Sequence, residues 1–195
     1  MYRILYALVE LAAAGVFLIP LFLLYGKFAA DRRMQFFCSI LFGFYFAAVL
    51  ALVGFPSILD HSPDVTLNLV PLAGIPADFK NACLNVLLFI PLGLFLPLLW
   101  DSCQSLRRTL LFALCVTLFI ELSQLFTLRA TDINDILTNL AGAAIGYFLA
   151  KHAAKVLPAA ASPNGKEPIL LCTITAAVFF FAQPFVSAFF WKLLL

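Results

Sequence analysis

The stretch ACLNVLLFIPLGLFLPLLW, residues 82–100, contains no charged side chain. A helix that crosses the hydrocarbon core of a bilayer needs about 20 mostly apolar residues. A helix is expected there because every backbone N–H and C=O group in lipid must find its partner within the protein. The stretch therefore predicts a transmembrane helix, and Pro91, Gly93 and Pro97 within it predict a kink or an irregular turn.

The composition of the whole chain also favours a membrane protein. Of its 195 residues, 64% are hydrophobic and 11% are charged, and the mean hydropathy is +1.06. A soluble domain has about 45–50% apolar and about 25% charged residues. The net charge of +2 does not indicate a nucleic-acid partner. The five cysteines form no CxxC motif and no Cys/His pair, so we interpret them as small buried hydrophobic residues.

Six apolar stretches are long enough to cross a bilayer, or nearly so. They are residues 4–25, 36–55, 82–100, 109–127, 136–151 and 169–191. The first is longer than the apolar region of a signal peptide and no clear cleavage site follows it, so we interpret it as a retained span. We expect an all-α fold, a polytopic transmembrane helix bundle of about six spans, forming a single membrane domain over residues 1–195.

The basic residues of the connections indicate an orientation. With six spans, most lysines and arginines fall on the side that holds the connections after spans one, three and five. The positive-inside rule makes that side cytoplasmic. We therefore expect a multi-pass protein of the bacterial cytoplasmic membrane with both termini outside the cytoplasm. The outer connection at residues 56–81 contains four prolines around an apolar middle, which predicts a short interfacial or re-entrant segment near residues 64–78.

Polar side chains gather near the outer ends of the expected spans. Glu121 and Gln124 are three residues apart at the end of the fourth span and face the same way. Asp132, Asp135 and Asn139 share one face at the start of the fifth span. Such groups are costly in lipid and are usually functional.

Three more polar residues are expected at a similar depth in the membrane. Asn85 lies in the first turn of the third span, Glu10 in the second turn of the first span, and Asn68 in the outer connection. A shared level about 5–10 Å below the outer surface predicts one polar site. The ligand-binding candidates are Asn68, Asn85, Glu121, Gln124, Arg129, Asp132, Asp135 and Asn139.

Several of these residues also have structural interpretations, which stay open. Glu121 and Gln124 could hydrogen-bond between helices. Asp132 is suited to be a helix N-cap, and Asp135 to complement the helix dipole. We expect Arg129 to pair with Asp132 or Glu121, because an unpaired charge at this depth is costly.

Two further features have mainly structural interpretations. Gly142 and Gly146 have the GxxxG spacing, which predicts a close helix–helix contact. Glu10 stands alone on its span and could reach outward to water or bond a neighbouring helix.

Three segments together resemble the core of VanZ-like membrane proteins: NLVPL at residues 68–72, NVLLFIPLGLFLPLL at 85–99, and IELSQLFTLRATDINDILTNLAGAAIGYF at 120–148. The specific part is the ensemble, with Glu-x-x-Gln followed by Arg-x-x-Asp-x-x-Asp-x-x-x-Asn-x-x-Gly. The resemblance covers residues 68–148 and leaves an extra C-terminal span at 169–191. Its motif residues here are Asn68, Pro71, Asn85, Pro91, Gly93, Glu121, Gln124, Arg129, Asp132, Asp135, Asn139 and Gly142.

The resemblance implies a role in the cell envelope, since the founding member of the family is associated with low-level teicoplanin resistance. Our first hypothesis is a protein that binds or remodels the head group of a membrane lipid or lipid-linked wall precursor at the outer leaflet, and so affects sensitivity to glycopeptides or lipoglycopeptides. Arg129 would meet a phosphate or carboxylate, and the amides would hydrogen-bond sugar or peptide. This hypothesis needs no cofactor and no metal.

Two alternatives stay open. A membrane-embedded hydrolase or transferase could use Glu121 as a base, with Asp132 and Asp135 holding a divalent cation. Against an enzyme, no Ser/His or Cys/His arrangement is present. A transporter of lipid or small solutes could use the acids and amides as a pathway, but they cluster in one leaflet and no internal repeat is obvious. The sequence does not indicate the oligomeric state.

Overall fold

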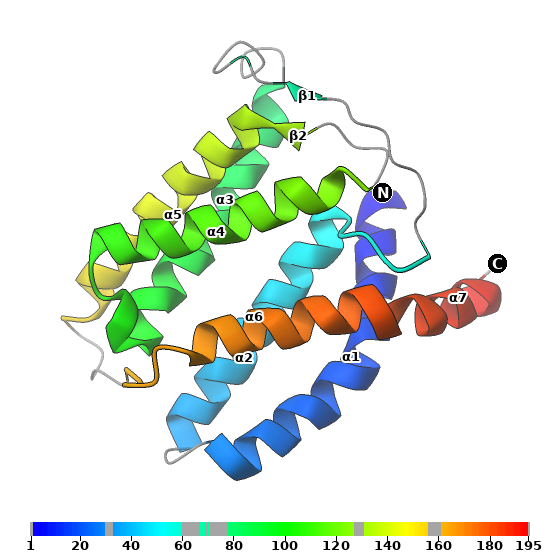
Figure 1. Cartoon of the computed structure of the whole chain (residues 1–195), viewed down its shortest axis with the longest axis horizontal. Helices are drawn as coiled ribbons and strands as arrows, with labels where there is room; N and C mark the ends of the chain where they lie inside the picture. The colour runs from blue at the N-terminus through cyan, green and yellow to red at the C-terminus, as the bar shows by residue number, and fades with distance from the viewer. Residues whose placement is uncertain are drawn as a thin grey trace. The chain divides into compact units, whose positions relative to one another are not determined.

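The computed structural model of the chain confirms the all-α fold predicted from the sequence (Figure 1). The structure describes residues 2–29, 33–59, 67–68, 70, 78–126, 131–155 and 161–194. Nearly all of these residues lie in helices, and two strands of two residues each accompany them.

The chain forms two compact units. The first unit combines Met1–Ser62 with Lys166–Leu195, and the second is Pro63–Gly165. The core that resembles VanZ-like proteins, residues 68–148, lies entirely within the second unit. The single membrane domain expected from the sequence stays a prediction, and the two units are described separately below.

In the first unit, α1 packs against α2 and α7, and α2 packs against α6. The elements are α1 (Tyr2–Ala29), α2 (Arg33–Val53), α6 (Glu167–Ala177), the π-helix η2 (Val178–Ala182) and α7 (Gln183–Leu194). α2 ends at Gly54, whose φ of 67° is the left-handed conformation that glycine adopts at helix C-termini. Large side chains fill the interior of this unit, among them Leu18, Phe22, Phe42, Phe46 and Leu50.

A buried carboxylate joins three helices of the first unit. Glu167, at the start of α6, accepts a hydrogen bond from the Ser39 hydroxyl at 2.7 Å and from the Gln35 amide at 3.5 Å. The Tyr25 side chain of α1 also interacts electrostatically with Glu167. This cluster was not predicted, because its members come from distant parts of the sequence.

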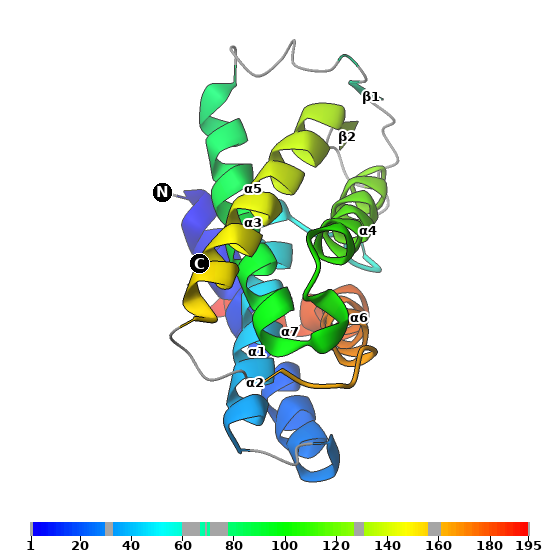
Figure 2. The ribbon, with the colours of Figure 1, turned by 90° about the vertical axis from the view of Figure 1, so that its left-hand side faces the viewer.

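In the second unit, α3 and α5 lie side by side, and two short strands lie at the end where both helices begin (Figures 1 and 2). The elements are β1 (Leu67–Asn68), α3 (Phe79–Leu99), the 3-10 helix η1 (Asp101–Cys103), α4 (Leu106–Gln124), β2 (Thr131–Asp132) and α5 (Ile133–Ala153). β1 and β2 pair in parallel. Pro91 and Pro97 both lie within the single helix α3.

Glycines bring α3 and α5 into close contact. A Cβ added to Gly142 would fall on the carbonyl group of Val86, and one added to Gly146 would fall on that of Ile90. Gly93 of α3 meets the backbone of α5 in the same way. The Gly142–Gly146 pair therefore lies in the kind of close helix contact that its spacing predicted. Because the paired positions increase together along both helices, α3 and α5 run parallel.

Five helical segments are long and apolar enough to cross a membrane. They are Ile4–Gly26, Gln35–Val53, Phe79–Leu99, Ile133–Ala153 and Glu167–Leu193. The remaining span expected from the sequence, residues 109–127, corresponds to α4, which is not among these five. α4 contains Arg107, Arg108 and Glu121, but these charges lie near its two ends. Since α3 and α5 run parallel, α4 is the helix that returns the chain between them. The chain is a multi-pass membrane protein.

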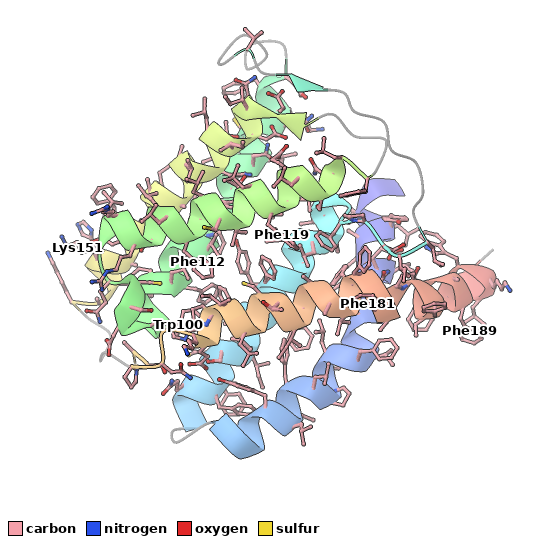
Figure 3. All side chains as sticks on the ribbon, in the orientation of Figure 1. Trp100, Phe112, Phe119, Lys151, Phe181 and Phe189 are labelled. Carbon is pink, nitrogen blue, oxygen red and sulfur yellow. The ribbon has the colours of Figure 1, made fainter. Side chains whose placement is uncertain are left out.

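The corner between α3 and α4 is held by the segment that follows α5. The Ser162 N–H donates to the Leu99 carbonyl at 2.6 Å, and the Asp101 N–H donates to the Ser162 carbonyl at 3.1 Å. Trp100, labelled in Figure 3, is fully buried at this corner. Tyr147 of α5 donates to the Gln104 carbonyl at 3.2 Å. These contacts join the ends of α3 and α5 to the start of α4.

The expected interfacial segment near residues 64–78 lies mostly outside the described residues. Within it the structure describes β1, Val70 and Asp78. β1 pairs Leu67 with Thr131 and Asn68 with Asp132. The sequence did not predict this strand pairing, because two residues are too few to show a strand pattern.

Candidate functional site

The face of α4 that is buried within the protein is unusually polar. α4 begins at Ser105, whose hydroxyl accepts a hydrogen bond from the Arg108 N–H at 3.4 Å. Thr109, Thr117, Glu121 and Gln124 are all buried on α4 at the spacing of one helix face. A helix in lipid normally keeps such groups inside the protein, where other polar groups can satisfy them.

Glu121 joins the end of α4 to the start of α5. Its side chain is 3% exposed. Its Oε2 atom accepts a hydrogen bond from the backbone N–H of Asp132 at 3.1 Å. A carboxylate next to a helix N-terminus is also favoured by the helix dipole. The sequence placed both residues in one site, but it did not indicate that the backbone of Asp132 is the donor.

Asp132 is the N-cap of α5, so the N-cap interpretation of the sequence is confirmed. Its Oδ1 atom accepts from both the backbone N–H and the side-chain amide of Asn134, each at 2.8 Å. The Asn134 amide also donates to the Val70 carbonyl at 3.4 Å. Asn134 was not among the sequence candidates, although it follows the predicted N-cap by two residues, where an N-cap side chain finds its donor.

Asn139 and Thr117 form the deeper part of the contact between α4 and α5. The Asn139 Nδ2 group donates to the Thr117 hydroxyl at 2.8 Å, and both side chains are buried. The Oδ1 atom of Asn139 has no hydrogen-bond partner within the described part of the chain. Thr117 was missed by the sequence reasoning, although it precedes Glu121 by one turn on the same face.

We call these side chains the polar seam, because they lie on the buried face of α4 or at the start of α5, where the two helices meet. The polar seam consists of Thr117, Glu121, Gln124, Asp132, Asn134 and Asn139. α4 and α5 run antiparallel, so the end of α4 meets the start of α5. Four of the six members lie in the last two turns of α4 or the first two turns of α5, and Asp132 is the N-cap of α5. The seam therefore gathers carboxylates, amides and a hydroxyl at one end of the helix pair.

Other sequence candidates lie near the polar seam. Asp135 is half-buried in the first turn of α5. Asn85 of α3 is half-buried and immediately precedes Val86, whose carbonyl contacts Gly142. Asn85 therefore lies within about one helical turn of the level of Asn139. β1 places the backbone of Asn68 beside Asp132.

Two residues selected from the sequence, Arg129 and Glu10, are not part of the polar seam. Arg129 lies outside the described residues, so its expected ion pair with Asp132 or Glu121 stays a prediction. Glu10 belongs to the first unit, where its Oε1 atom accepts from the Trp191 indole N–H at 3.5 Å. This contact fits the interpretation in which Glu10 bonds a neighbouring helix.

The described residues contain no group of three or more His, Cys, Asp and Glu side chains that could hold a metal ion. Asp132 uses its carboxylate to cap α5, and Glu121 uses its carboxylate to join the two helices. The cation site proposed for the enzymatic alternative stays a prediction.

The fold and the polar seam define a multi-pass helical membrane protein with a buried polar contact between two helices. Residues 42–156 match the VanZ/LLP1 family model, and the chain belongs to the VanZ/LLP1 family. The matched residues include the whole polar seam, whereas Glu10 and Glu167 lie outside the match.

A named relative is similar over part of its length. The chain is 35% identical over 85 residues to "Protein VanZ" of Enterococcus faecium, a match that covers 43% of this chain and 52% of that protein. The chain thus spans about half the length of the curated relative it matches. No solved structure matches the chain.

Proposed function

We propose that the protein binds the head group of a membrane lipid or lipid-linked wall precursor, and that the polar seam takes part in the recognition. In this proposal the site lies at the outer leaflet of a bacterial cytoplasmic membrane, and both termini are extracytoplasmic. Binding would remodel or shield the head group and so alter sensitivity to glycopeptide or lipoglycopeptide antibiotics. Membership of the VanZ/LLP1 family and the similarity to Protein VanZ favour the envelope as its place of action.

One observation carries the proposal. In a chain that is 64% hydrophobic, α4 and α5 each bury two side chains that carry a carboxylate or amide group. These side chains lie at one end of the contact between the two helices. Apolar side chains would join two helices in lipid without the desolvation cost of such groups. A lipid head group carries ester, phosphate, hydroxyl or amine groups, and these can interact with the buried polar side chains.

The chemistry of the candidates suits a head group. Carboxylates and amides hydrogen-bond hydroxyl and amine groups, and Arg129 supplies a guanidinium group that pairs with phosphate in a bidentate way. Arg129 comes three residues before Asp132, the N-cap of α5. The proposal therefore assigns the phosphate to Arg129 and the polar groups of the head to the seam.

The test is lipid analysis of the purified protein. The parent, Arg129→Ala and the control Ser123→Ala would be purified in nanodiscs of one lipid composition, and the bound lipids identified by mass spectrometry. Ser123 is a suitable control because its hydroxyl donates to the Ile120 carbonyl of its own helix. A phosphate-bearing lipid enriched in the parent and the control, and lost in Arg129→Ala, is the expected result. Equal retention by Arg129→Ala contradicts the proposal.

The same preparation separates the enzymatic alternative. Glu121→Gln keeps an oxygen that can accept from the Asp132 N–H but removes the charge. A binding protein keeps most of its lipid in this variant. If the parent instead converts the bound lipid into a product and Glu121→Gln does not, the protein is a hydrolase or transferase and the binding proposal is wrong.

A further inference from the structure

Asn139 carries a hydrogen-bond acceptor that the described residues leave unused. The side chain is 5% exposed, and its Nδ2 group already donates to the Thr117 hydroxyl at 2.8 Å. Its Oδ1 atom is buried with no partner among the described residues. A buried acceptor without a partner is uncommon in native proteins and has a free-energy cost, so each case calls for an explanation.

Two described donors near Asn139 already have partners elsewhere. The Asn134 amide donates to Asp132 and to the Val70 carbonyl. The Thr138 hydroxyl, next to Asn139, donates to the carbonyls of Asn134 and Asp135 in its own helix. Glu121 adds a carboxylate, which when ionised only accepts hydrogen bonds. The seam is thus rich in acceptors, and the amide groups of Asn134 and Asn139 already donate within the protein.

Resting on the proposed function, we infer that the bound head group presents an O–H or N–H donor to the Oδ1 atom of Asn139. The seam would then select head groups that carry such a donor, a hydroxyl of glycerol or sugar or the ammonium of an ethanolamine. A head group with a phosphate and no donor would leave the acceptor unsatisfied. Asn139 is a specificity-determining residue in this inference, while the phosphate is recognised elsewhere.

Three lipids that share a phosphate test the inference. Phosphatidylglycerol presents hydroxyls, phosphatidylethanolamine presents an ammonium group, and phosphatidylcholine has no donor. The parent would be exchanged into nanodiscs with equal amounts of all three, and the lipid retained after delipidation quantified by mass spectrometry. We expect the parent to retain one or both donor-bearing lipids about tenfold over phosphatidylcholine, the effect of one unsatisfied buried acceptor. Which of the two is enriched distinguishes a hydroxyl from an ammonium donor.

Variants of Asn139 test whether this side chain causes the preference for donor-bearing lipids. Asn139→Leu removes the acceptor and should bring the ratio of retained donor-bearing lipid to retained phosphatidylcholine close to one. Asn139→Asp keeps an acceptor oxygen and should retain the preference, because Thr117 can donate to the new side chain. Thr138→Val is the matched control, since it removes an adjacent hydroxyl that bonds only to its own helix. Thermal melting of each variant would establish that it folds. The comparison of the three lipids in the parent tests the inference without any variant.

The outcomes separate the inference from the proposed function. If the parent retains phosphatidylcholine as well as the other two lipids, the inference is wrong, and phosphate recognition is judged separately by the comparison with Arg129→Ala. A preference that persists in a folded Asn139→Leu variant also overturns the inference. If the parent enriches none of the three over the bulk composition and no other phosphate-bearing lipid co-purifies, the proposed function itself fails.

Discussion

The carboxylate of Glu121 accepts a hydrogen bond at 3.1 Å from the backbone N–H of Asp132, and so joins the last turn of one helix to the first turn of the next. Asp132 in turn caps α5 with its own carboxylate. The two acids that the sequence suggested for chemistry therefore also set the geometry of the site. A substitution at either position changes the helix connection as well as any ligand contact, so conservative variants are needed to separate the two effects.

Glu121→Leu should destabilise the protein more than Glu121→Gln. Leucine leaves the Asp132 N–H without its acceptor, which costs about 1–3 kcal/mol for a group shielded from water. Glutamine keeps an acceptor oxygen and should cost less. Equilibrium unfolding of both variants in mixed micelles titrated with sodium dodecyl sulfate would measure the difference, with Ser123→Ala as the control on the same helix turn. Equal stability of the leucine and glutamine variants would show that the hydrogen bond does not matter.

Gly142→Ala should weaken the packing of α3 on α5. The added methyl group falls on the carbonyl of Val86, so the two backbones must move apart. We expect a loss of about 1–3 kcal/mol, the usual cost of overpacking. Gly15→Ala is the control, because a Cβ there meets nothing within 4 Å. The same unfolding titration applies, and a Gly142 variant as stable as the Gly15 variant would contradict the close contact.

Ser39 and Glu167 should be energetically coupled. The Ser39 hydroxyl donates to the Glu167 carboxylate at 2.7 Å, and both side chains are buried. A double-mutant cycle with Ser39→Ala and Glu167→Leu, each of which removes the hydrogen bond, should give a coupling free energy of about 1–2 kcal/mol, because the bond is charge-assisted. Thr173→Val is the control partner, since Thr173 is exposed and bonds only to the Ile169 carbonyl of its own helix. A coupling no larger than that between Thr173 and Glu167 would refute the prediction.

Labelling should place the two ends of the α3–α5 pair on opposite sides of the membrane. Lys80 is exposed in the first turn of α3, and Lys151, labelled in Figure 3, is exposed in the last turn of α5. In a variant without the native cysteines, Lys80→Cys should react with a membrane-impermeant maleimide added to intact cells. Lys151→Cys should react only after permeabilisation. The reverse pattern would invert the proposed orientation and move the polar seam to the cytoplasmic leaflet.

Most of the candidate site could be found from the sequence because polar residues stand out in an apolar chain. Glu121, Gln124, Asp132 and Asn139 were selected by their helical spacing, and the structure brings them into one seam. Thr117 was missed because threonine is common in membrane helices and carries little signal. Asn134 was missed because its role is to bond the N-cap, and such a bond depends on local backbone geometry.

The sequence by itself determined that the chain is an all-α membrane protein, because the length and hydropathy of a span follow directly from the thickness and chemistry of the bilayer. It also determined which residues are too polar for lipid. Only the tertiary structure decided that α3 and α5 pack closely against each other, that β1 pairs with β2, and that Ser39 meets Glu167. These contacts join residues far apart in the chain, and what brings them together is the packing of helix against helix, which no local pattern encodes.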